Sequence, residues 1–151
     1  MNNHTAKTTG RSHRREIRLP RQSGWRWLTA AVLVHLVVSV VHGVAHSEAH
    51  VPLSRTANFF VFGVIVAGPL VGLALAVWSE RIGSWVIAIT MASALVFGCA
   101  NHFVLVGPDH VWQVAERWRP MFTITAMLLA AIEGPASALA IRIARGTRIA
   151  S

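Results

Sequence analysis

Four long apolar stretches constrain the fold of this chain more than any other feature of its sequence. They lie at about residues 27–45, 57–78, 82–106 and 121–141. Each is close to the roughly 20 residues that cross about 30 Å of hydrocarbon as an α-helix. With 54% hydrophobic and 13% charged residues, the chain is too apolar for an ordinary soluble domain. The sequence therefore predicts an all-α, polytopic membrane protein with a transmembrane domain over residues 25–142.

Short connections between the stretches favour a four-transmembrane-helix antiparallel bundle. The positive charges predict its orientation, because cytoplasmic loops of membrane proteins carry an excess of Lys and Arg. Most of the 14 Lys and Arg residues precede the first stretch, follow the fourth or lie between the second and third. The exceptions are Arg55, Arg117 and Arg119. We therefore expect an N-in/C-in protein of the cell inner (cytoplasmic) membrane, with basic cytoplasmic tails at residues 1–24, which should be disordered, and 143–151.

The charge pattern also bears on partners. The net charge of +8 could suggest nucleic acid, but the basic segments lack the interleaved aromatics of a nucleic-acid-binding arm. We expect no nucleic-acid partner; the expected partners are the lipid bilayer and either other membrane subunits or further copies of this chain. Arg14 and Arg15 before an apolar run resemble an export signal, but the run exceeds the ~7–15 residues of a signal core. We expect the first stretch to be retained.

Histidines gather in the outer half of the first stretch. His35, His42, His46 and His50 follow helical spacing together with Ser39. At about 100° per residue, these side chains fall within an arc of about 80° on one helix face. If the helix continues to His50, this face carries two successive i, i+4 histidine pairs. That separation allows two imidazoles to share one metal ion.

The third stretch brings a further histidine to the same level. His42 and His102 each lie about four residues below the outer end of their stretch, so we expect them to be a cofactor-binding pair. The following loop adds an oxygen donor and an imidazole. The predicted metal ligands are thus His42, His46, His50, His102, Asp109 and His110. Such a set suits Zn, Cu or Fe, whereas two facing imidazoles could instead hold a b-type haem (haem b).

A second polar pair is expected deeper in the membrane. His35 lies about eight residues from the inner end of the first stretch, and Glu133 about eight from that of the fourth. An unpaired acidic residue at the bilayer centre costs on the order of 3 kcal/mol, so Glu133 should face the bundle interior and pair with His35. The pair fits either a proton or cation step or a polar clamp between helices.

These patterns lead to one functional hypothesis and two alternatives. The hypothesis is a small integral membrane protein whose His-rich outer face binds a transition metal or b-type haem, for redox, metal handling or complex assembly. The alternatives are a non-catalytic membrane subunit with structural histidines, and an ion- or proton-coupled transporter. The sequence carries no Gly-rich phosphate loop, GxSxG or HExxH motif, so catalytic residues stay unassigned and enzymatic activity is left open.

Overall fold

The computed structural model describes residues 21–146, and over that range the chain forms helices and no strands. In chain order these are α1 (Arg21–Glu48), α2 (Arg55–Phe60), η1 (Val61–Ala67), α3 (Gly68–Ala76), α4 (Glu80–Cys99), η2 (Ala100–Val104) and α5 (Arg119–Gly146). The two η elements are π-helical and continue their neighbours, so the described chain has four long helical runs. All four are long and apolar enough to cross a membrane, as predicted.

The helices extend beyond the apolar stretches. α1 begins at Arg21 and α5 ends at Gly146, so residues 21–24 and 143–146, predicted as parts of the tails, are helical. Each of these helices has 28 residues, or about 42 Å, which matches a bilayer with its headgroups rather than its hydrocarbon alone. The remaining tail residues, 1–20 and 147–151, lie outside the described residues.

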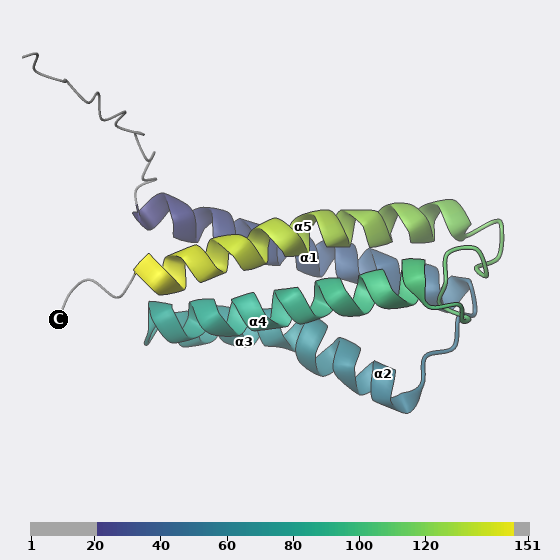
Figure 1. The fold of residues 1–151 in the computed structure, drawn as a ribbon, viewed down its shortest axis with the longest axis horizontal. Helices are drawn as coiled ribbons and strands as arrows, with labels where there is room; N and C mark the ends of the chain where they lie inside the picture. Colours follow the sequence, from purple (N-terminus) through teal and green to yellow (C-terminus); the bar gives the residue numbers. More distant parts are fainter. Residues whose placement is uncertain (1–20, 147–151) are drawn as a thin grey trace, which may run out of the picture.

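Helix α5 packs against both α1 and α4, and α4 packs against α3. The start of α1, the α3–α4 link and the end of α5 lie at one end of the molecule, on the left of Figure 1. The loops at residues 49–54 and 105–118 lie at the other end, which we call the loop end. The histidines of interest therefore approach one another near the loop end.

The half of the molecule away from the loop end is tightly packed. Its core contains Leu28 and Val32 of α1 with Ile87 and Met91 of α4. Helices α3 and α4 touch so closely that a Cβ atom added to Gly83 would overlap α3. Close helix contact through small residues is typical of membrane bundles. This half holds the helices together through its packed core.

The loop-end half is more open, because the second helical run departs from the other helices there. Pro69 has no N–H to donate to the carbonyl of Ile65, and the chain forms the wider π-helical turns of η1 just before it. Helix α2, which precedes η1 in the chain, diverges from the other helices toward the loop end (Figure 1). The divergence leaves space beside α1 at the level of its histidines.

Candidate metal centre

Three buried imidazoles meet near the loop end. His42 and His46 lie one turn apart on α1, and His102 comes from η2. Nε2 of His42 lies 3.3 Å from Nε2 of His102, and one possible ligand nitrogen from each of the three rings lies within 4.8 Å of the others. The three side chains are 6–8% exposed. The predicted proximity of His42 and His102 is confirmed; we call the three residues the histidine triad.

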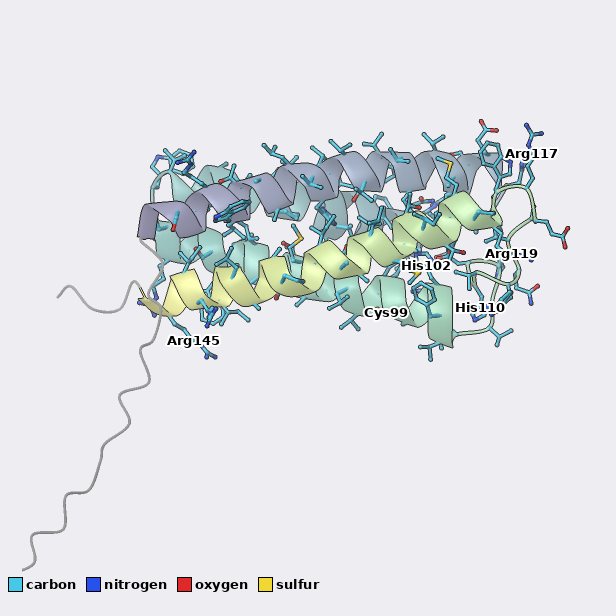
Figure 2. The ribbon with its side chains drawn as sticks, turned by 90° about the horizontal axis from the view of Figure 1, so that it is seen from above. Cys99, His102, His110, Arg117, Arg119 and Arg145 are labelled. Atoms are coloured by element: carbon cyan, nitrogen blue, oxygen red, sulfur yellow. The ribbon has the colours of Figure 1, made fainter. Side chains whose placement is uncertain are left out.

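The backbone around His102 explains how this ring reaches the triad. His102 sits in the π-helical turns of η2, after which the chain leaves the helix at Leu105. The loop then folds back, and the N–H of Val111 donates to the carbonyl of His102 over 3.0 Å. Figure 2 shows His102 toward the same end as His110 and the rest of this loop. Regular helix periodicity contains no sign of the π-turn, so sequence reasoning did not predict it.

The tautomer of His42 is determined by Thr125 of α5. Nδ1 of His42 lies 2.8 Å from Oγ1 of Thr125, whose hydroxyl donates to the carbonyls of Met121 and Phe122 over 2.8 and 3.0 Å. The hydroxyl has one proton, which we assign to these two carbonyls of its own helix; with that assignment Oγ1 accepts the hydrogen bond from Nδ1–H of His42. In the neutral ring the lone pair is therefore on Nε2.

The same reasoning applies to His102. Its Nδ1 lies 3.1 Å from the backbone carbonyl of Asp109 and 3.3 Å from Oδ1 of the same residue. Both oxygens are acceptors, so Nδ1 carries the proton and Nε2 carries the lone pair. The two Nε2 lone pairs of His42 and His102 thus face each other. Two neutral rings repel in this arrangement unless a proton or a cation lies between them.

The separation of these two nitrogens fits a shared metal ion. Two nitrogens bound at about 2.0–2.1 Å with a tetrahedral angle between them lie about 3.3 Å apart. Nε2 of His42 and Nε2 of His102 are separated by that distance, 3.3 Å. Completing a three-nitrogen site requires the His46 ring to move closer, since the three ligand atoms lie within 4.8 Å of one another rather than within 3.3 Å.

Asp109 orients the third ring. Its Oδ1 lies 3.0 Å from Nε2 of His46. Burial raises the pKa of Asp109, but the contacts with His102 and His46 outweigh burial and hold this pKa well below its usual range. The carboxylate thus makes an ion-pair contact with Nε2 of His46, whereas Nδ1 of His46 is buried without a hydrogen-bond partner. Each triad ring therefore has one nitrogen held by a neighbour and one free, as is usual for metal-ligating histidines.

Phe122 closes one side of the triad. Its ring centroid lies 4.8 Å from those of His42 and His46 and 5.0 Å from that of His102. Phe122 is fully buried in a small apolar cluster with Ala45, Val111 and Val114. This cluster shields the rings from water at the loop end. Phe122 and Thr125 were not among the predicted site residues, because neither residue type signals a metal site by itself.

A cavity of about 550 Å³ borders the triad. All three triad rings line it, together with residues of α1, α2, η1, α4 and α5. The triad residues thus border an open volume large enough for a ligand, since ligand pockets typically measure about 300–1,000 Å³.

The deeper polar pair is also present. Nε2 of His35 lies 3.0 Å from Oε1 of Glu133, and both side chains are buried. The predicted contact is confirmed. Glu133 and Ser39 also line the cavity beside the triad, so a buried acidic group borders the same volume.

Two predicted ligands, His50 and His110, are not brought to the triad. Helix α1 ends at Glu48, and His50 follows in a left-handed conformation with φ of 53°, exposed and with its Nδ1 3.0 Å from the carbonyl of Glu48. The helix face that carries His35, His42 and His46 therefore ends before His50. His110 lies in the loop, where its Nδ1 accepts from the N–H of Trp112 over 3.3 Å. Within residues 21–146, the group able to share a metal consists of the triad alone.

Comparisons with protein-family models, with curated proteins and with solved structures found no match to this chain. The structure shows apolar helices that are able to cross a membrane and a buried histidine triad that could hold a metal ion. The functional argument therefore starts from the geometry of the triad.

Proposed function

We propose that this chain is an integral membrane protein whose histidine triad binds one transition metal ion. The observation that carries the proposal is the 3.3 Å separation of the Nε2 atoms of His42 and His102, both of which present lone pairs. A shared cation removes the repulsion between them. Asp109 and Thr125 act as positioning residues, since they hold the ring nitrogens that face away from the ion.

The donor set suits Zn²⁺, Cu²⁺ or Fe²⁺, because neutral imidazole binds all three. Among them Zn²⁺ fits best, since the His42–His102 separation of 3.3 Å corresponds to a tetrahedral angle. A haem between the same two rings fits less well. Axial ligands on opposite faces of one iron lie about 4 Å apart, from bonds of about 2.0 Å. The packing of Phe122 against all three rings also leaves little height for a macrocycle on its side.

The proposed centre is reactive or exchangeable rather than structural. Structural zinc sites are usually closed by four protein ligands, whereas catalytic sites use three and keep one position open. The triad supplies three nitrogens, and the cavity borders them. We infer that the open position faces the cavity, where the ion can polarise or exchange a bound group.

The membrane arrangement is part of the proposal. We propose an antiparallel bundle in the inner membrane with both termini cytoplasmic and the triad near the outer face. Arg81, Arg142 and Arg145 follow the positive-inside pattern, and Arg145 lies at the end opposite to Arg117 and Arg119 (Figure 2). The loop end would then face outward.

Elemental analysis and an absorption spectrum of the purified protein test the proposal. We expect about one equivalent of Zn, Cu or Fe per chain and no Soret band. His42→Ala and His102→Ala should lose the metal, whereas His50→Ala and His110→Ala serve as matched controls and should retain it. A chain that holds no metal after exposure to Zn²⁺, Cu²⁺ and Fe²⁺ would refute the metal centre. A stable stoichiometric partner in that case would favour the non-catalytic subunit.

A second candidate, proton-coupled transport, draws support from the His35–Glu133 pair. Glu133 is buried, lies 3.0 Å from His35 and lines the cavity. Buried ionisable residues in membrane helices often take part in proton relays. Proton flux into proteoliposomes that Glu133→Gln abolishes would favour transport, and equal flux in the two forms would exclude this role for Glu133.

A further inference from the structure

The cavity beside the triad opens sideways, between α1 and η1. Its exposed lining residues all belong to these two elements: Val40, Gly43 and Ser47 of α1, and Phe62 of η1. Val40 is 61% exposed and Phe62 is 67% exposed. The lining residues from α4 and α5 are buried or half-buried. The mouth therefore lies where the second helical run departs from the bundle, as Figure 1 shows for α2.

The depth of this mouth places it in hydrocarbon. Val40 lies eight residues before the end of α1 at Glu48, which corresponds to about 12 Å at about 1.5 Å per residue. A headgroup layer takes up about 5–7 Å on each side of a bilayer whose hydrocarbon is about 30 Å thick. With the helix spanning both layers, the mouth near Val40 and Phe62 faces acyl chains. A molecule entering there comes from the lipid phase.

The back wall of the cavity is polar, in contrast to its mouth. It contains the triad, the Oγ of Ser39 and Glu133. Ser39 Oγ and Nδ1 of His46 are both buried without a hydrogen-bond partner. An occupant that satisfies both ends needs an apolar chain at the mouth and a polar group that reaches the triad.

Charge selects the kind of polar group. A divalent ion on three neutral imidazoles carries two positive charges, and the Asp109 carboxylate beside the triad offsets one of them. Glu133, the other acidic residue of this wall, is paired with His35 instead. The net positive charge in a water-poor site favours an anionic oxygen ligand in the open position.

We propose that the cavity binds a single-chain anionic amphiphile from the outer leaflet, such as a fatty acid. It enters between α1 and η1, its chain lies along Val40 and Phe62, and its oxygen head group binds the metal ion of the triad. The inference rests on the proposed metal centre. The volume of about 550 Å³ suits one chain with a small head group, because pockets of about 300–1,000 Å³ enclose molecules of drug size.

The test uses Co²⁺ in the triad, because the visible spectrum of Co²⁺ changes when its fourth ligand changes. The full chain is reconstituted in phosphatidylcholine nanodiscs, loaded with Co²⁺ and titrated with palmitate or with acetate. Acetate has the same head group without the chain. We expect palmitate to shift the spectrum at a concentration at least about 100-fold lower than acetate, since each buried CH₂ group adds binding energy.

Gly43→Leu blocks the mouth without disturbing the backbone, because a Cβ atom at Gly43 meets nothing within 4 Å. Gly63→Leu is the matched control: a Cβ atom there also meets nothing within 4 Å, and Gly63 does not line the cavity. We expect Gly43→Leu to weaken palmitate binding at least about tenfold and to leave acetate binding unchanged. Gly63→Leu should behave like the unmodified chain.

The outcomes separate this inference from the metal centre. If Co²⁺ binds but palmitate acts no better than acetate, or if Gly43→Leu binds palmitate normally, the lipid site is refuted and the metal centre stands. If no Co²⁺ spectrum develops in the unmodified chain, both proposals fail.

A second measurement needs no variant, in case Gly43→Leu does not fold. A palmitate analogue with a photoreactive group in its chain should cross-link to residues 40–47 and 61–66 in preference to the rest of the lipid-facing surface. Uniform labelling of that surface would contradict the proposal.

Discussion

Replacing Thr125 with valine isolates one hydrogen bond that we assign to the metal centre. Valine has nearly the shape of threonine but no oxygen, so Nδ1–H of His42 loses the acceptor that lies 2.8 Å away. The imidazole proton then moves to Nε2, where it can bridge to Nε2 of His102 over 3.3 Å. A proton occupies the position proposed for the metal, and the ion has to displace it.

The expected size of the effect follows from the role of such partners. Loss of a hydrogen bond behind a metal-ligating histidine typically lowers metal affinity about 10- to 100-fold, or about 1.4–2.7 kcal/mol. We expect Thr125→Val to lose Zn²⁺ affinity by this amount. Thr125→Ser keeps the hydroxyl and should stay within about threefold of the unmodified chain.

Competition with a chromophoric chelator measures the Zn²⁺ affinity of each variant in detergent. NMR of chains labelled with ¹⁵N-histidine reports whether the proton of His42 is on Nδ1 or Nε2 in the metal-free form. The reasoning is refuted if Thr125→Val binds Zn²⁺ as tightly as the unmodified chain, or if Thr125→Ser loses as much affinity as Thr125→Val.

Three further predictions concern the bundle around the site. Glu133→Leu should lower the free energy of unfolding by about 1–3 kcal/mol in a detergent titration, because it leaves buried Nε2 of His35 without a partner, whereas Glu133→Gln should cost less. Gly83→Leu should destabilise the protein in the same assay by about 1–3 kcal/mol or more, because the side chain would overlap α3, and Gly63→Leu should be neutral. For the orientation, Glu116→Cys is made in a chain whose native cysteine is replaced by alanine. This cysteine should react with an impermeant maleimide added to intact cells. Labelling only after the cells are permeabilised would reverse the proposed orientation.

Much of the site could be predicted by counting residues along the spans. Depth in a membrane helix depends on the number of residues from its end, so His42 and His102 were expected at one level, and so were His35 and Glu133. Both pairs are in contact. The i, i+4 spacing of His42 and His46 likewise brings two rings to one helix face. The depth of a residue and the i, i+4 spacing can both be read without knowing how each helix is rotated.

The same counting failed where the backbone departs from a regular helix. His50 lies on the same helix face as His42 and His46 only if α1 continues past Glu48. The chain instead turns there, with φ of 53° at His50. Asp109, by contrast, lies beside the triad as expected, with its Oδ1 3.0 Å from Nε2 of His46 and 3.3 Å from Nδ1 of His102, and its role as a ligand stays a prediction. Loop conformation depends on local hydrogen bonds that residue spacing does not encode.

The sequence by itself determined four apolar helices able to cross a membrane, and the level at which each polar residue lies along them. Hydrophobic length and a constant rise per residue are sufficient for both. Only the tertiary structure decided that Thr125 and Phe122 contact the triad, that η2 turns His102 toward α1, and that a cavity opens between α1 and η1. These features depend on helix rotation and side-chain packing between segments up to 83 residues apart, as for His42 and Thr125, and no single segment specifies them.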